Sequence, residues 1–210
     1  MTSQHGAHGV DAHPTLHDEF LDHRRRGFAY GFFGGGLAGR LDHRRLVAFA
    51  DRGRPYRFDD VVRAFHAAGV SEGESIFVHA ELRNLGQLVD LTDKASFTDF
   101  FIEALHASVG EQGTLLMPAF SYSYTKGEVY DPASTPSTVG ILSERFRTRP
   151  GVSRSMDPIF SVCARGPRQA TLLATSHDCF GAGSVFGKLH EANARLVFIG
   201  ERFDITFMHY

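Results

Sequence analysis

The strongest constraint on the fold is an alternation of helix-type and strand-type segments from Pro55 onward. Apolar residues recur at helical spacing after Asp59, and a short β-type run follows at Ser75–His79. The same order repeats, with a helical segment at Ser96–Gly110 and a β-type run at Thr114–Met117. Strands that alternate with helices are typical of α/β proteins, in which helices cover a central sheet.

The rest of the chain continues this pattern. Further helices are expected around Val139–Phe146, at Pro167–Thr175 and at Val185–Asn193, and further strands at Ile159–Ala164 and Leu196–Ile199. In α/β sheets, ligands bind where strands end and loops begin. Residues that directly follow the expected strands are therefore the first candidates for a functional site.

The first 55 residues lack this periodicity. We therefore divide the chain into a His- and Gly-rich extension, residues 1–55, and an α/β domain, residues 56–210. Residues 1–24 contain five histidines, but their spacing fits no standard zinc site and no cysteine joins them. We expect a solvated arm there. Residues 27–38 are rich in Gly and aromatic residues, and the sequence leaves open whether they pack irregularly on the core or on a partner subunit.

Composition argues against several functional classes. A formal net charge of -2 gives no electrostatic reason to expect nucleic acid or a membrane surface as a partner. No run of about 18 apolar residues exists, so no transmembrane helix is expected. Arg24–Arg26 and the apolar stretch after them resemble a twin-arginine signal weakly, but glycines interrupt that stretch. The two cysteines, Cys163 and Cys179, are expected as reduced thiols in a cytoplasmic protein.

Five motifs occur in a fixed order within residues 56–210. They are Gly73–Leu82 followed by Gly86, Gly113–Ser121, Tyr130–Arg147, Pro150–Val162, and Gly183–His209 with its final Thr206-Phe207-Met208-His209. Together they resemble the aminoglycoside 3-N-acetyltransferase family. The resemblance implies a layered α/β/α fold with a central mixed sheet. It also implies an enzyme that takes an acetyl group from acetyl-CoA and needs no metal.

The acyl donor is expected at the ends of strands. A strand that ends in a tight turn and opens a helix at Ala80–Leu82 would present free backbone N–H groups, which suit a phosphate or a pantetheine amide. The resemblance adds the loop at Pro118–Ser121 and the turn at Ser184-Val185. For Gly183 and Gly187, ordinary turn and helix-start chemistry is the alternative explanation. The candidate donor-binding residues are His79, Ala80, Glu81, Leu82, Ala119, Ser121, Ser184, Val185 and Phe186.

Catalysis requires a base, because an amine must lose a proton before or during its attack on a thioester. Histidine is the usual base near neutral pH, and the resemblance places His209 in this role. Acidic residues would orient the imidazole or hold ammonium groups of the substrate. Asp157 and Glu144 are the catalytic candidates of this kind. The candidate substrate-binding residues are Tyr130, Asp131 and Asp204.

The sequence also departs from the family's usual pattern. Asp157 stands where the family usually has histidine, Ala80 and Glu81 replace paired serines, and Val185 replaces proline. The family continues well beyond the motif that ends at His209, so we expect the domain to be incomplete at its C-terminus. Either the chain is then part of a longer or cleaved polypeptide, or a second chain supplies the remainder, for which residues 1–55 would substitute only in part. A homodimer is also left open.

Three functions remain open at this point. The first is an N-acyltransferase that acts on a small-molecule amine, such as an aminoglycoside, an amino sugar or a biosynthetic amine. The second is a non-catalytic or altered-cofactor relative, which the departures at Glu81 and Asp157 favour. The third is a cysteine-nucleophile acyltransferase or hydrolase, because His177-Asp178-Cys179 places a thiol beside an imidazole and a carboxylate in sequence.

Overall fold

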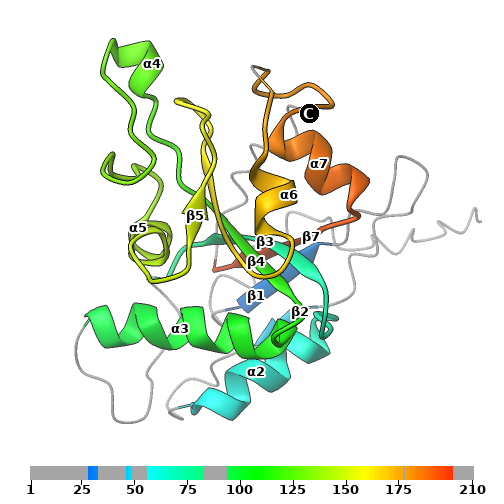
Figure 1. The fold of residues 1–210 in the computed structure, drawn as a ribbon. Helices are drawn as coiled ribbons and strands as arrows, with labels where there is room; N and C mark the ends of the chain where they lie inside the picture. Colours follow the sequence, from blue (N-terminus) through cyan, green and yellow to red (C-terminus); the bar gives the residue numbers. More distant parts are fainter. Residues whose placement is uncertain (1–27, 33–45, 49–55, 83–93, 177, 201–210) are drawn as a thin grey trace, which may run out of the picture.

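The computed structural model describes residues 28–32, 46–48, 56–82, 94–176 and 178–200, which form one sheet with helices on both faces (Figure 1). The strands are β1 (Phe28–Phe32), β2 (Leu46–Ala48), β3 (Ser75–Ala80), β4 (Thr114–Pro118), β5 (Ser153–Arg154), β6 (Val162–Arg165) and β7 (Arg195–Ile199). The helices are α2 (Phe58–Ala67), α3 (Lys94–Val109), α4 (Ser123–Lys126), α5 (Ile141–Arg147), α6 (Gln169–Leu173) and α7 (Val185–Glu191).

The sheet is mixed, with strand order β2-β1-β7-β3-β4-β6-β5. The three central strands, β7, β3 and β4, run parallel, and Phe77 of β3 pairs with Leu116 on one side and Leu196 on the other. The flanking strands are antiparallel to their inner neighbours. The parallel strands therefore end at one edge of the sheet, where α/β proteins bind ligands.

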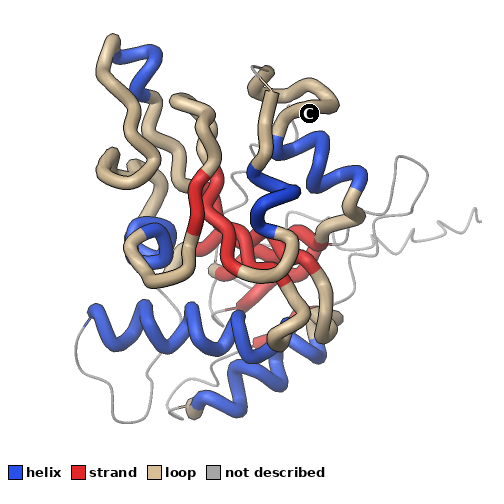
Figure 2. The backbone as a smooth tube through the Cα atoms, viewed as in Figure 1, coloured by secondary structure: helices blue, strands red, loops and turns tan. Residues whose placement is uncertain are grey.

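Alternating side chains of the central strands belong to two separate hydrophobic cores, one on each face of the sheet. Ile76 and Val78 of β3 point to the face covered by α2, α3 and α5, whereas Phe77 points to the face covered by α6 and α7. Figure 2 shows the strands between these two groups of helices. Strands buried on both faces read as continuous apolar runs, as β3 and β4 do. The layered α/β/α fold expected from the sequence is confirmed.

The helix at α2 also follows its sequence signals. Asp60 accepts a hydrogen bond from the backbone N–H of Arg57 at 2.8 Å, which caps the first turn. Val61 and Phe65 are buried on its inner face. Gly69, at φ +93°, follows its end in a conformation that favours glycine.

Several element boundaries differ from the expectation. Helix α3 begins at Lys94 instead of Ser96, so Ser96 lies in its first turn. Strand β6 begins at Val162 instead of Ile159, because the Asp157 carboxylate takes the N–H groups of Ile159 and Phe160 in a turn.

Part of the N-terminal segment joins the sheet. Residues 28–32 form β1, which pairs antiparallel with β7 and with β2. They therefore form a strand of the sheet and do not pack as an irregular segment. The division of the chain at residue 55 stays a prediction.

Candidate functional site

The candidate site lies where the central parallel strands end. Strand β3 ends at Ala80, β4 at Pro118 and β7 at Ile199. The donor-binding residues proposed from the sequence fall in three groups, of which Ser184–Phe186 at the start of α7 is one. His79–Leu82 form the end of β3 and the segment after it, and Ala119 and Ser121 follow β4.

The segment after β3 is held closely against the end of β7. The backbone N–H of Glu81 donates to the carbonyl of Ile199 at 2.7 Å. The expectation of a free N–H at Glu81 is therefore wrong, and no helix begins within Ala80–Leu82. Gly200 lies so close that a Cβ built on it would be 2.0 Å from the carbonyl oxygen of Glu81. Only glycine fits this approach.

Aromatic rings connect several segments on the face of the sheet that α6 and α7 cover. The His79 ring stacks on Phe198, with centroids 5.4 Å apart, and meets Phe77 edge-on at 4.8 Å. From Phe77 the contacts continue through Phe186, Phe180, Phe160 and Phe120 at centroid distances of 6.2, 5.3, 4.9 and 5.3 Å. This series joins β3, the start of α7, the loop before α7, the turn before β6 and the segment after β4.

The turn before α7 is built around Ser184. Its side chain accepts a hydrogen bond from the backbone N–H of Gly187 at 3.1 Å and caps the helix. The side chains of Val185 and Phe186 are buried in the core between the sheet and helices α6 and α7. Only the backbone of these two residues could therefore contact a ligand without repacking.

Ala119 and Ser121 are also buried, and their polar groups have partners within the protein. The Ala119 carbonyl accepts from the Ser161 hydroxyl at 2.8 Å, and its N–H donates to the Ser161 carbonyl at 2.8 Å. Ser121 donates its hydroxyl to the Pro158 carbonyl at 3.1 Å and accepts from the Lys126 ammonium at its own carbonyl at 3.0 Å. The segment after β4 is thus fixed to the turn before β6.

Asp157 shapes that turn. Its Oδ1 accepts from the N–H groups of Ile159 and Phe160 at 2.8 and 2.9 Å. Burial raises the pKa of the Cys179 thiol to about 11, and a hydrogen bond to Asp157 and its charge add to this. A thiol with a raised pKa is a poor nucleophile at neutral pH, which argues against the cysteine mechanism. His177 lies outside the described residues.

The other cysteine, Cys163, belongs to the core. Cys163 is fully buried in β6, and burial raises the pKa of its thiol to about 12.

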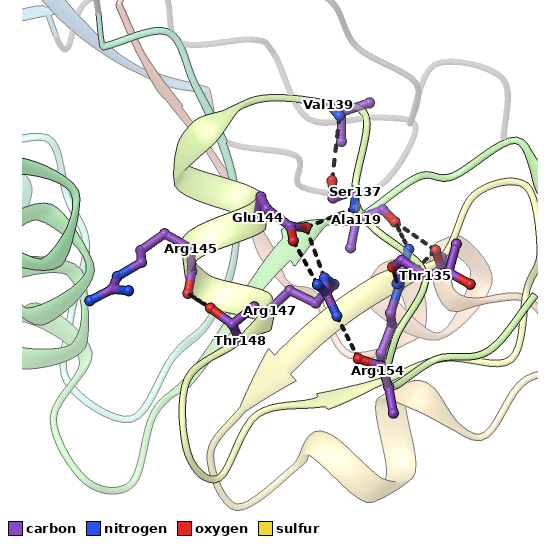
Figure 3. A network of polar contacts seen from close by, with 11 residues as sticks. Ala119, Thr135, Ser137, Val139, Glu144, Arg145, Arg147, Thr148 and Arg154 are labelled. Atoms are coloured by element: carbon purple, nitrogen blue, oxygen red, sulfur yellow. Dashed lines mark hydrogen bonds and ion pairs between the residues drawn. The ribbon is translucent and has the colours of Figure 1, made fainter. Parts of the chain in front are cut away.

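Glu144 on α5 is engaged in an ion pair. Its carboxylate accepts from the Arg147 guanidinium at 2.6 and 2.8 Å and from the Ser137 N–H at 2.7 Å (Figure 3). The Arg147 hydrogen bonds, which outweigh burial, lower the pKa of Glu144. Arg147 also donates to the Ala133 carbonyl at 2.7 Å. The pair therefore ties the loop at 130–137 to α5.

Tyr130 and Asp131 begin this same loop. The Tyr130 hydroxyl donates to the Ser155 carbonyl at 2.6 Å, and burial raises its pKa. Asp131 accepts from the Ser134 hydroxyl at 2.6 Å and from the Ala133 N–H at 3.0 Å. These hydrogen bonds, that of Ser134 first, lower the pKa of Asp131. Both residues lie on the loop, whereas His209 and Asp204 lie outside the described residues.

Arg154 belongs to a family motif, but its sequence position alone predicts no role for it. It lies in β5, and its guanidinium donates to the Ala119 and Thr135 carbonyls and to the Ser161 hydroxyl. It therefore contacts both the segment after β4 and the loop that carries Tyr130 and Asp131. The motif Arg154-Ser155-Met156-Asp157-Pro158 was the available signal, but its partners are distant in sequence.

The described part of the chain contains neither a metal-binding cluster nor a membrane-spanning helix. No group of three or more His, Cys, Asp or Glu side chains in these residues is arranged to hold a metal ion. Among the helices of the described ranges, none combines the length and the apolar character needed to cross a membrane.

Comparison with known proteins identifies aminoglycoside 3-N-acetyltransferases as similar to this chain, both by sequence profile and by pairwise similarity. A sequence profile described as aminoglycoside 3-N-acetyltransferase matches residues 77–210. Aminoglycoside N(3)-acetyltransferase IV of Salmonella sp is 32% identical over 146 residues, which cover 67% of this chain and 52% of that protein. The chain thus spans about half the length of this curated relative.

Solved structures agree with this similarity. A structure of AAC-IIIb in a binary complex with CoASH superposes with a TM-score of 0.65 at 27% identity, covering 75% of this chain and 64% of that one. AAC-VIa bound to sisomicin gives the same TM-score, identity and coverage of both chains. These superpositions agree with the fold described above.

Proposed function

Since the chain belongs to the aminoglycoside 3-N-acetyltransferase family, we propose that it transfers an acetyl group from acetyl-CoA to an amino group of an aminoglycoside. The match of the family profile over residues 77–210 carries this proposal. The CoASH complex of AAC-IIIb and the sisomicin complex of AAC-VIa support the choice of donor and acceptor.

The donor is assigned to the edge where β3 and β4 end. His79–Leu82, Ala119, Ser121 and the turn Ser184–Phe186 would line it. The buried side chains of Val185 and Phe186 favour backbone contacts from this turn. The chain offers rigid support here, since hydrogen bonds and ring contacts fix these segments to the sheet. Fixed groups lower the entropic cost of bringing donor and amine together.

His209 is assigned as the general base. It would take a proton from the substrate ammonium or from the amine as the nitrogen attacks the thioester carbonyl. The new C–N bond forms, the C–S bond breaks, and the coenzyme A thiolate leaves and is protonated. Asp131 and Asp157 would hold ammonium groups of the substrate, together with Tyr130 and Asp204. Glu144 would act through the loop it fixes, because Arg147 already engages its carboxylate.

The proposal is tested by thiol release from acetyl-CoA with aminoglycosides as acceptors. His209→Ala should lower kcat by about 100-fold or more, because a positioned general base contributes roughly 10²–10⁴. His190→Ala, a change of an exposed histidine on α7, serves as the matched control and should keep the wild-type rate. Full activity of His209→Ala would refute the assignment of the base.

The non-catalytic alternative is tested separately by calorimetry. Glu81 places a carboxylate at the end of β3, where it would repel a pyrophosphate group. Saturable binding of acetyl-CoA would support the transferase despite this charge. If the wild-type chain neither binds acetyl-CoA nor releases thiol with any aminoglycoside, the proposed activity is wrong and the non-catalytic relative is favoured.

A further inference from the structure

Arg154 connects three segments that are far apart in the sequence. Its Nε donates to the Ser161 hydroxyl at 3.1 Å, its Nη1 to the Thr135 carbonyl and its Nη2 to the Ala119 carbonyl. Figure 3 shows its side chain extending toward Ala119 and Thr135. One planar group thus holds the segment after β4, the loop at 130–137 and the turn before β6.

This arginine is unusual in its partners. No carboxylate of the described residues lies within ion-pair distance of its guanidinium, although other half-buried arginines such as Arg147, Arg149 and Arg195 pair with carboxylates. Instead, its Cζ lies 5.1 Å from the centroid of the Tyr130 ring. A half-buried cation without a counterion is costly unless neutral groups solvate it. Two carbonyls, a hydroxyl and a ring do so here, which makes its orientation specific.

The contacts of Arg154 have a geometric consequence. The Ala119 carbonyl also accepts from Ser161, and the Ala119 N–H donates to Ser161, so the end of β4 cannot shift without breaking all three contacts. Tyr130 is likewise fixed, since its hydroxyl donates to Ser155 and its ring faces Arg154. Arg154 is therefore one of the side chains that set the separation between the segment after β4 and the loop at 130–137. Directly after that loop, Thr138 donates its N–H and its hydroxyl to the Phe120 carbonyl at 2.9 and 3.0 Å.

We propose that Arg154 is a positioning residue that fixes the segment at 119–121 relative to the loop at 130–137. In this way it holds the acyl donor and the amine at the distance and orientation that the reaction needs. The assignment of these two segments to donor and amine rests on the proposed function. The link that Arg154 makes between the two segments does not rest on it, because that link follows from the hydrogen bonds of Arg154.

Arg154→Lys is the test, because lysine keeps the charge but cannot reach three acceptors with a planar fork. A misplacement of about 1 Å can cost about 10²-fold in rate. We therefore expect kcat to fall by up to about 100-fold, with a melting temperature close to that of the wild type and little change in either KM. Arg149→Lys is the matched control, because Arg149 pairs with Asp99 and Glu103 on α3, away from both segments. It should keep the wild-type kcat.

Hydrogen exchange supplies a measurement that does not depend on turnover. In Arg154→Lys, the amides of Ala119 and Thr138, which bond to Ser161 and Phe120, should exchange faster than in the wild type. Amides of α2 should not change. Ser161→Ala offers a milder variant if Arg154→Lys fails to fold, since it removes one hydroxyl from the same group and should shift the same amides less.

The outcomes separate the two proposals. Wild-type kcat and wild-type exchange in Arg154→Lys would overturn the role of Arg154. Uniformly faster exchange throughout the domain would also overturn it, because the residue would then stabilise the fold in general. If the wild type transfers no acetyl group but exchange rises only in the two segments, the proposed function fails and the role of Arg154 stands.

Discussion

The close approach of Gly200 to Glu81 allows a sharp prediction for stability. Gly200 has φ +96°, and a Cβ there would lie 2.0 Å from the Glu81 carbonyl oxygen. Gly200→Ala therefore meets two penalties, one from the backbone conformation and one from the contact. Gly73→Ala meets only the first, because Gly73 has φ +80° and a Cβ added there would have no neighbouring atom within 4 Å.

The two penalties can be estimated separately. A left-handed conformation costs a non-glycine residue about 1–2 kcal/mol, and the lower entropy of the unfolded alanine chain returns about 0.4–1 kcal/mol. Gly73→Ala should therefore cost about 1 kcal/mol. At Gly200, reaching an ordinary contact of 3.4 Å from 2.0 Å requires a shift of 1.4 Å. That shift breaks the 2.7 Å hydrogen bond from Glu81 to Ile199, and leaving its groups unpaired costs about 1–3 kcal/mol.

Urea denaturation of the wild type and both variants measures the difference. We expect Gly200→Ala to lose about 3 kcal/mol and Gly73→Ala about 1 kcal/mol. In thermal unfolding these losses correspond to about 6–12 °C and about 2–4 °C for a chain of this size. Equal losses for the two variants, within about 0.5 kcal/mol, would show that the segment after β3 is not held against β7 as described.

Two further changes test the site's supports and the pH dependence of folding. Ser184→Ala removes the cap of α7 and should cost about 1 kcal/mol in urea denaturation; an unchanged midpoint would mean that the hydroxyl does not cap the helix. Burial would raise the pKa of Glu74, but its hydrogen bonds, mainly to Arg195, outweigh this and lower it. Because the pKa of Glu74 is lower in the folded protein, its ionised carboxylate stabilises the fold at pH values above the ordinary pKa of 4.5. This stabilisation is lost as the pH falls through the pKa of the folded state. The stability gap between the wild type and Glu74→Gln should therefore shrink from pH 7 to acid, and a constant gap in urea midpoints would contradict the ion pair.

The sequence predicted the strands and helices that carry a periodic apolar pattern. Strands β3, β4 and β7 and helices α2 and α3 lie close to their expected positions because their patterns are local. Strand β1 was not predicted, since Gly31 and its neighbours lack alternation and the segment becomes a strand through pairing with β7 and β2. The apolar residues Ile159 and Phe160 suggested a strand, but a side chain hydrogen bond holds them in a turn.

The candidate site was predicted in outline only. The motifs fall at strand ends, as expected, because this follows from the order of elements in α/β folds. The long-range partners of their side chains were not predictable. Glu144 and Arg147 are three residues apart on one helix, which is a local spacing, whereas Arg154 meets a carbonyl that is 35 residues away in sequence. Long-range contacts of this kind depend on how the segments meet in three dimensions, which no local pattern encodes.

The place of β7 in the sheet has a consequence for synthesis of the chain. Ile76 of β3 pairs with Arg195 of β7, a separation of 195 − 76 = 119 residues. At about 5–20 residues per second, one side of β3 waits about 6–24 s for its partner strand during translation. An apolar strand with an unpaired edge is a template for aggregation during that interval. Slow translation should therefore lower the soluble yield, and coexpressed chaperones that shield exposed strands should raise it.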